Sequence, residues 1–130
     1  MCVFCQIIQG NIPSTKIYED DDVLAILDIS QTTKGHTLVM PKEHYDNMLE
    51  CPKSLLDKVM CVTQDLAKKI TSNLNAKGCN ILVNTNEVAG QSVMHMHVHI
   101  IPRYNENDTV SFEFKENKFN LEEIKKEILK

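Results

Sequence analysis

The longest periodic pattern in the chain is an apolar stripe between Pro52 and about Ala76. Its members recur at steps of three and four residues, which is the period of a helix with one buried face. They are Leu55, Leu56, Val59, Met60, Thr63, Leu66, Ala67, Ile70 and Leu74. The pattern predicts one long helix over 52–76, because Pro52 suits its first turn and Gly78 follows its end.

Shorter apolar runs bounded by turn residues predict five strands. We expect them at 15–19, 23–28, 36–40, 79–83 and 96–101, with the third ended by Pro41 and the fifth by Pro102. A short N-terminal helix is expected at 4–9, where Gly10 stops it, and a C-terminal helix after Asn120, which suits an N-cap. This succession indicates an α+β fold, a five-stranded antiparallel sheet with the long helix on one face.

Three of the chain's five histidines, His95, His97 and His99, occupy alternate positions in the fifth predicted strand. Side chains alternate between the faces of a strand, so these three should share one face while the apolar residues between them face the core. Neighbours on one face lie about 6.6 Å apart, which suits a row of imidazoles along one substrate. It suits a single zinc less well, because ligand nitrogens must converge to about 2.0–2.1 Å from the ion. If the three histidines have no function, they simply form a solvated face of the strand.

Composition narrows the classes of function. The 130 residues are 42% hydrophobic and 25% charged, with a formal net charge of −4, so the broad basic surface of a nucleic-acid binder is not expected. No apolar run approaches the roughly 18 residues of a membrane span, and the start of the chain lacks the features of a signal peptide. We therefore expect a cytoplasmic protein that binds neither nucleic acid nor membrane, with reduced cysteines rather than disulfides.

The histidine row is part of a longer resemblance. The segment His95–Ile101 matches the pattern His-φ-His-φ-His-φ-φ, in which φ is apolar. Three longer segments also match in order and with the expected gaps: FCQIIQGNIPSTKIYEDDDVLAILDIS, KGHTLVMPKEHYDN and AGQSVMHMHVHIIPR. The chain therefore resembles the histidine triad family, in particular the bacterial branch of its nucleotide-binding proteins. The resemblance implies a single histidine triad domain over 1–130, with a core at about 2–104 and a C-terminal extension at 105–130.

The resemblance implies a nucleotidyl hydrolase or transferase. Enzymes of this family cleave nucleoside 5′-phosphoramidates or dinucleoside polyphosphates at the α-phosphorus, through a covalent nucleotidyl-histidine that water then hydrolyses. By position, His97 is the nucleophile, and His99 and His36 assist at the phosphate. Ser92 matches a position that contacts phosphate and protonates an amine leaving group. A neutral imidazole suits this role near pH 7, provided that its other ring nitrogen donates its proton to a partner such as a backbone carbonyl.

The resemblance also places the substrate. Asp28 would accept hydrogen bonds from the ribose hydroxyls, and Asn84 would lie on the phosphate side. In the turn 90–93, which contains Gln91, backbone N–H groups would cradle phosphate oxygens. The base pocket would be lined by Phe4, Ile7, Ile29 and Leu38, together with Val3 and Leu27. The resemblance implies a purine nucleotide, and an apolar slot implies weak discrimination between purines. Without the resemblance, these residues are more simply an ordinary turn, a strand-end aspartate and plain core.

Cys2 and Cys5 form a Cys-x-x-Cys pair at the start of the chain. The pair alone is compatible with reduced thiols or with a redox pair. Together with His44 and His95 it makes a set of two cysteines and two histidines, one of the closed tetrahedral arrangements of structural zinc. Several bacterial members of the family resemble this chain in carrying these four residues. We therefore expect a structural zinc that holds the N-terminal segment on the sheet and, having no open position, activates no water.

Other functions stay open from the residues alone. One is a metal-dependent hydrolase with the three alternate histidines as ligands, although no nearby carboxylate follows the usual base-supplying spacing. Another is a purine-nucleotide-binding sensor or interaction protein with vestigial hydrolysis, which tight binding without turnover would indicate. The resemblance further implies a homodimer, and a small sheet with an exposed edge makes pairing reasonable. The long helix and the strand at 79–83 are the expected interface.

Overall fold

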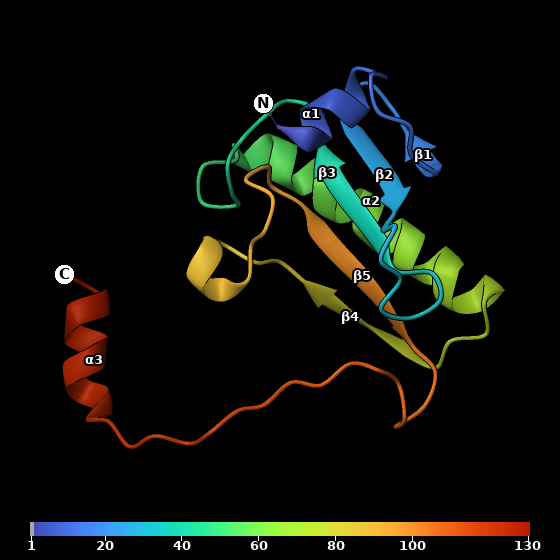
Figure 1. Ribbon diagram of the computed structural model, residues 1–130. Coiled ribbons are helices and arrows are strands. Elements are labelled where there is room, and N and C mark those ends of the chain that lie inside the picture. Colours follow the sequence, from blue (N-terminus) through green and yellow to red (C-terminus); the bar gives the residue numbers. More distant parts are fainter. Residues whose placement is uncertain (1) are drawn as a thin grey trace.

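The structure is a computed structural model that describes residues 2–130 (Figure 1). Its helices are α1 (Val3–Ile8), α2 (Lys53–Asn73) and α3 (Leu121–Ile128), and a 3₁₀ turn, η1, spans Glu87–Ala89. Its strands are β1 (Lys16–Glu19), β2 (Val23–Leu27), β3 (Thr37–Pro41), β4 (Gly78–Leu82) and β5 (Val98–Arg103). The strands pair antiparallel in the order β1-β2-β3-β5-β4, which confirms the predicted α+β fold with one five-stranded sheet.

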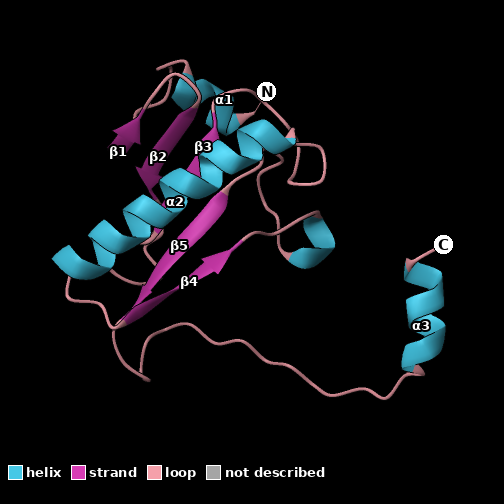
Figure 2. Cartoon of the chain, turned by 180° about the vertical axis from the view of Figure 1, so that it is seen from behind, coloured by secondary structure: helices cyan, strands magenta, loops and turns pink. Residues whose placement is uncertain are grey.

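The sheet carries a different helix on each face (Figures 1 and 2). The core under α2 contains Val23, Ala25, Val39, Val98 and Ile100 of the sheet with Val59, Leu66 and Ile70 of the helix. The core under α1 contains Phe4 and Ile7 of the helix with Leu24, Ile26, Leu38 and Met40 of the sheet. Because side chains alternate along β5, the burial of its apolar residues under α2 leaves His97 and His99 on the α1 face.

The strand that carries the histidines begins later than the sequence pattern predicts. It starts at Val98 rather than at Met96. The backbone N–H of Met96 donates to the carbonyl of Tyr45 at 2.7 Å, in the loop after β3. The backbone before Val98 therefore bonds outside the ladder, and two of the three alternate histidines lie on the approach to the strand.

Both prolines that were expected to end strands pair with a neighbouring strand. Pro41 pairs with Val23 of β2 and is the last residue of β3, so the strand ends at Pro41 as predicted. Pro102 pairs with Cys79 of β4 and β5 continues to Arg103, so the predicted end at Pro102 is wrong. β3 and β5 pair with each other only over residues 37–39 and 98–100. Each proline therefore lies where its strand has a single neighbour, and a missing N–H is tolerated at such a position.

Gly35 sets the packing of the turn before β3 against the end of α2. Its φ is +96°, and a Cβ built on it would lie 2.6 Å from Cδ1 of Leu74 and 3.3 Å from Cγ of Pro102. Only glycine satisfies both the left-handed backbone and this close approach. The turn positioned in this way presents His36 immediately before β3.

The C-terminal extension passes β4, where Phe112 and Phe114 line a pocket with Ile81, and ends away from the sheet. Figures 1 and 2 both show a long arm after β5 with α3 at its far end. The arm is tied near its start, where the hydroxyl of Tyr104 donates to the carbonyl of Lys34 at 2.5 Å. Asn120 caps α3 through its side chain, as predicted. None of the helices within residues 2–130 is both long and apolar enough to cross a bilayer.

Candidate active site and metal centre

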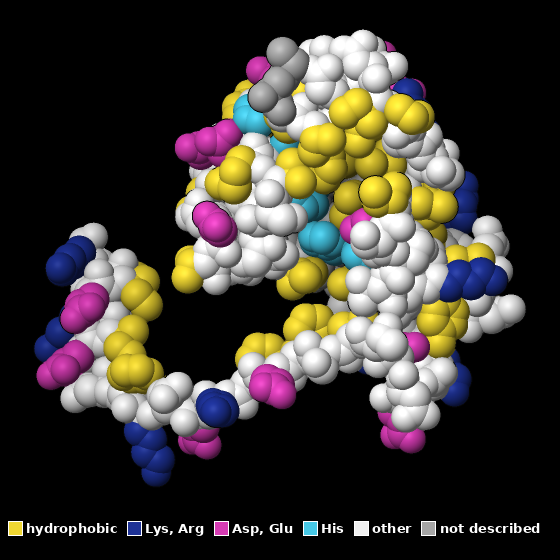
Figure 3. All heavy atoms as spheres, viewed as in Figure 1, with side chains coloured by type: hydrophobic (Ala, Val, Ile, Leu, Met, Phe, Trp, Pro, Cys, Tyr) yellow, Lys and Arg dark blue, Asp and Glu magenta, His cyan; other side chains and the backbone are white. Residues whose placement is uncertain are grey.

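A cleft of about 280 Å³ opens on the α1 face of the sheet. Figure 3 shows histidine side chains at the bottom of a hollow with a largely hydrophobic rim. The lining residues are Val3, Phe4, Ile7, Ile12, Pro13, Ser14, Ile26, Leu27, Asp28, Ile29, Leu38, Ser92, Val93, His97 and His99. A mostly apolar cleft with a few convergent polar groups is the usual form of a small-molecule site.

His97 is buried and has one ring nitrogen fixed by the backbone. Its Nδ1 lies 2.7 Å from the carbonyl oxygen of His95. A carbonyl only accepts, so Nδ1 carries the proton of the ring and Nε2 presents a lone pair. Burial lowers the pKa of His97 below its ordinary value, so the ring is neutral near pH 7. Phe4 packs edge-on against it, with ring centroids 5.0 Å apart.

His36 and His99 form a hydrogen-bonded pair beside His97. Nδ1 of His36 accepts the backbone N–H of Thr32 at 3.4 Å, so we place the His36 proton on Nε2. This nitrogen donates to Nδ1 of His99 at 2.9 Å, and His99 therefore carries its own proton on Nε2. Burial, with the neighbouring His97 and His36 rings, lowers the pKa of His99 to about 4. His99 is thus a neutral hydrogen-bond donor at pH 7.

Asp28 follows β2 and lines the cleft next to this pair. Its Oδ1 accepts the backbone N–H of Ser30 at 2.8 Å, and its Oδ2 lies 3.7 Å from Nε2 of His36. The carboxylate keeps lone pairs for a further donor. Asp28, His36 and His99 place possible ligand atoms within 4.8 Å of one another. The 2.9 Å between the two ring nitrogens is a hydrogen-bond length, so we interpret the group as a polar network.

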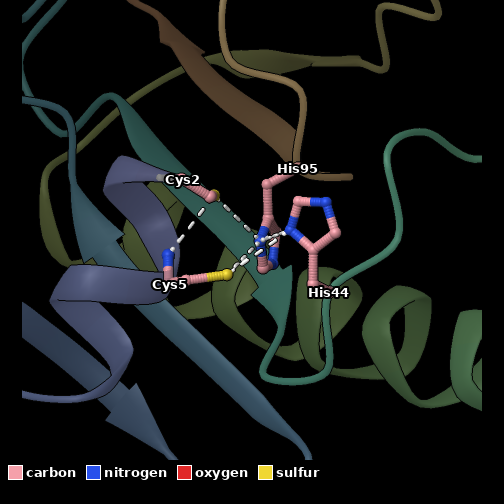
Figure 4. A group of neighbouring side chains, drawn as sticks. All are labelled: Cys2, Cys5, His44 and His95. Carbon is pink, nitrogen blue, oxygen red and sulfur yellow. Dashed lines mark hydrogen bonds between the residues drawn. The ribbon is translucent and has the colours of Figure 1, made fainter.

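Four side chains converge at the other end of the histidine row: Cys2, Cys5, His44 and His95 (Figure 4). From Nδ1 of His95, the two sulfurs lie 3.5 and 3.6 Å away and Nδ1 of His44 lies 3.1 Å away. Sγ of Cys5 lies 3.4 Å from Nδ1 of His44. A tetrahedral zinc has S–N edges of about 3.6 Å and N–N edges of about 3.3 Å, given its usual bond lengths. The four donors therefore fit a tetrahedral zinc.

We call Cys2, Cys5, His44 and His95 the metal group. In both of its histidines, the Nδ1 atom that faces the other possible ligands carries no proton. Nε2 of His95 donates to the carbonyl of Pro41, and Nε2 of His44 donates to Oδ1 of Asp46, each at 2.8 Å. Nδ1 of each ring then offers a lone pair toward the sulfurs. Carbonyl and carboxylate partners of this kind orient histidine ligands in zinc sites. The sequence reasoning missed Asp46, whose only signal was its place two residues after His44.

The three alternate histidines do not share one site. His95 belongs to the metal group, His97 lines the cleft, and His99 pairs with His36. Within residues 2–130, no group of possible ligands combines the three. The geometry therefore offers no common ligand set to a metal-dependent hydrolase built on them.

The residues expected in the base pocket lie along the cleft, at different depths. Phe4, Ile7 and Leu38 are buried in its wall, whereas Ile29 is 98% exposed and lies at the rim. The sequence reasoning missed Ile12, Pro13, Ser14 and Val93, which also line the cleft. They lie in loops, where no periodic pattern marks a shared wall. Oγ of Ser14 is buried without a hydrogen-bond partner among the described residues.

The turn before the histidine row approaches the cleft through Ser92, which is part of its lining. Asn84 is not among the lining residues, and its side-chain amide donates to the carbonyl of Gly90 at 3.4 Å. The side chain of Gln91 is buried and bonds to backbone groups. Both residues were expected near the phosphate. The observed contact of Asn84 is with the turn itself, whereas Gln91 contacts the turn and the carbonyl of Asp46 in the loop after β3.

Comparisons with known proteins agree on one family. Residues 9–106 match the HIT domain family. The chain is 51% identical over 107 residues to Protein hit of Bacillus subtilis, covering 82% of this chain and 74% of that protein. It is 41% identical over 102 residues to Adenylylsulfatase HINT3 of Arabidopsis thaliana, covering 78% of this chain and 52% of that protein. The crystal structure of a Zn-bound histidine triad family protein from Mycobacterium smegmatis superposes with a TM-score of 0.80 at 39% identity, covering 89% of this chain and 84% of that one.

Proposed function

Because the chain belongs to the HIT domain family, which includes an adenylylsulfatase, we propose that it is a nucleotide hydrolase. Its substrates are nucleoside 5′-phosphoramidates or dinucleoside polyphosphates, cleaved at the α-phosphorus through a nucleotidyl-histidine on His97. The observation that carries the proposal is the 2.7 Å hydrogen bond from Nδ1 of His97 to the carbonyl of His95. It leaves a lone pair on Nε2, in a ring that burial keeps neutral.

The reaction is a double displacement at phosphorus. Nε2 of His97 attacks the α-phosphorus, an N–P bond forms, and the bond to the leaving group breaks. Ser92, which lines the cleft, protonates an amine as it leaves. Water then attacks the same phosphorus and its proton restores the Ser92 hydroxyl, while the N–P bond breaks, His97 regains its Nε2 lone pair and the nucleoside 5′-monophosphate is released. Splitting one difficult displacement into two lowers each barrier.

Two groups hold the nucleotide beside His97. The Nε2–H of His99 donates to a phosphate oxygen, and its low pKa keeps this donor neutral and fixed at physiological pH. The carboxylate of Asp28 accepts from the ribose hydroxyls. His36 is buried and outside the cleft lining, so it acts by orienting His99. The apolar walls take a purine base with few polar contacts.

The metal group holds a structural zinc. The tetrahedral spacing of its four donors supports this assignment, and a structural relative is Zn-bound. When bound, the ion supplies a cross-link between the start of the chain and the sheet, and four protein ligands leave it no position for a substrate water. Cys2 caps α1 and Cys5 lies within it. The same helix carries Phe4 and Ile7 into the cleft wall, so the ligands also anchor the base pocket.

The single-domain chains form a homodimer. β4 is an edge of the sheet, with a paired strand only on its β5 side, and Ile81 on it is 43% exposed. An unpaired edge of this kind favours association with a second copy. Light scattering distinguishes a dimer from a chain of 14.8 kDa, and the monomeric mass would contradict the dimer.

The test of the hydrolase is turnover of adenosine 5′-phosphoramidate by the wild type and by His97→Ala, with circular dichroism to show that both are folded. We expect release of AMP by the wild type and a loss of at least about 10³-fold in the variant. A dinucleoside tetraphosphate is assayed in parallel. Equal rates in the two proteins would refute the role of His97. Tight nucleotide binding without turnover of either substrate would favour a nucleotide-binding sensor.

A further inference from the structure

The side chain of Gln91 joins the loop after β3 to the turn that reaches the cleft. It is buried to 2% exposure. Its Oε1 accepts the backbone N–H of Asn86 at 2.8 Å. Its Nε2 donates to the carbonyl of Asp46 at 2.6 Å and to the carbonyl of Val93 at 3.0 Å. One amide therefore ties together both ends of the turn 86–93 and a separate loop.

Asp46 connects this amide to the metal group. Its backbone carbonyl accepts from Gln91, and its carboxylate accepts from Nε2 of His44 at 2.8 Å. The opposite nitrogen of His44 is one of the four possible metal ligands. Only Asp46 thus separates a metal ligand from the amide that braces the turn. A weaker parallel bond runs from Nδ2 of Asn47 to the side chain of Asn86 at 3.3 Å.

The turn that Gln91 braces has a backbone that needs support. Asn86 has a φ of +72° and Gly90 a φ of +102°, and the first is an uncommon conformation for a residue other than glycine. The backbone N–H of Gln91 closes the turn by donating to the carbonyl of Asn86 at 3.2 Å. Ser92 follows directly and lines the cleft. Its position therefore depends on the hydrogen bonds of Gln91.

We propose that Gln91 is a positioning residue that couples metal binding by Cys2, Cys5, His44 and His95 to phosphate binding at the turn 90–93. The inference rests on the proposed function, because it takes this turn to contact the substrate phosphate. Metal binding fixes the His44 ring, the Asp46 carboxylate is held with it, and the Asp46 carbonyl fixes the Gln91 amide. Because coupling between two binding sites is reciprocal, the nucleotide phosphate raises metal affinity by the same factor.

The test compares AMP with adenosine, which lacks only the phosphate. The ratio of the adenosine dissociation constant to that of AMP isolates the phosphate contribution from that of the base pocket. Calorimetry measures both constants for the wild type and for Gln91→Met, with zinc bound and after chelation. Gln91→Met approximately keeps the side-chain volume and removes the three side-chain hydrogen bonds. Gln64→Met makes the same change at an exposed position of α2 and is the matched control.

We expect chelation to lower this ratio about ten-fold in the wild type and in Gln64→Met, the size of one or two hydrogen bonds. Gln91→Met with zinc bound should show a similar reduction, and chelation should then change its ratio no further. Its affinity for adenosine should stay within about two-fold of the wild type, which a general loss of structure would not allow. AMP should also raise the zinc affinity of the wild type but not that of Gln91→Met.

Other outcomes would contradict individual steps of the proposal. An unchanged ratio in Gln91→Met refutes the positioning role. A ratio that still falls on chelation of this variant refutes the coupling through Gln91. If circular dichroism shows that Gln91→Met is unfolded, Gln91→Glu decides by the same measurements, because it keeps an acceptor for Asn86 and loses the two donated bonds. A wild type that binds AMP no better than adenosine contradicts the proposed function itself, and the inference with it.

Discussion

The pKa of His99, lowered to about 4 by burial and by the His97 and His36 rings, makes the stability of the fold depend on pH. In the unfolded chain the pKa of a histidine is about 6.5. Between these two values the unfolded state binds a proton that the folded state does not. The free energy of unfolding therefore has its full contribution from His99 above about pH 6.5, and this contribution is lost as the pH is lowered toward about 4.

The size of this effect follows from the difference of about 2.5 pH units. At 1.36 kcal/mol per unit, the free energy of unfolding loses about 3 kcal/mol over the whole window and about 2 kcal/mol by about pH 5. His99→Gln removes this penalty, and it also perturbs the 2.9 Å hydrogen bond with His36, which costs about 1 kcal/mol. The variant should be less stable than the wild type at about pH 7 and more stable at about pH 5, with the two curves crossing at about pH 6.

The assay is urea unfolding followed by circular dichroism, at steps of about half a pH unit from neutrality to about pH 4.5. The quantity compared is the difference in free energy of unfolding between the wild type and His99→Gln. Groups that titrate alike in both proteins cancel in this difference. A difference that stays constant over the range, or a wild type that gains relative stability as the pH falls, would refute the burial argument.

Three further changes test other parts of the structure. Gly35→Ala should lower the free energy of unfolding by at least about 2 kcal/mol more than Gly10→Ala does. Both glycines have positive φ, but only a Cβ at position 35 would meet another side chain, at 2.6 Å. Equal losses in urea unfolding would refute this packing. Cys5→Ser should release zinc at a lower chelator concentration than the wild type, whereas Cys61→Ser, at an exposed free thiol, should not; equal zinc retention would remove Cys5 from the ligand set. Ser14→Ala should weaken AMP binding, measured by calorimetry, because it removes a polar group from the cleft lining. It should not lower the free energy of unfolding, because a buried hydroxyl without a partner among the described residues costs the unliganded protein about 1 kcal/mol. Unchanged affinity would show that the hydroxyl does not contact the nucleotide.

Local signals in the sequence were enough to predict α2 and the approximate positions of the five strands along the chain. The apolar stripe predicts a helix over 52–76, and the observed helix is Lys53–Asn73, because helix periodicity and the terminal residues are properties of one continuous segment. The start and the end of β5 could not be predicted in this way. Whether the strand continues past Pro102 depends on how many strands flank this proline, which only the sheet order decides.

The candidate site was predicted through family resemblance more than through local pattern. The alternation of histidines predicts a shared face but not that His95 turns to Cys2 while His99 turns to His36. The role of Asp46 depends on which ring nitrogen it faces, and no spacing encodes that contact. Gln91 was expected at the substrate, yet its amide is turned inward, because the backbone groups of the turn need partners.

The most direct test of the nucleotidyl-histidine is the stereochemistry at the α-phosphorus. A substrate made chiral there by sulfur is hydrolysed in water enriched in oxygen-18, and the configuration of the nucleoside phosphorothioate product is determined. Each in-line displacement inverts the phosphorus, so attack by His97 followed by attack by water predicts overall retention. Retention would support the two-step reaction whether or not the intermediate accumulates. Inversion would show that water attacks the substrate directly, and would contradict His97 as the nucleophile.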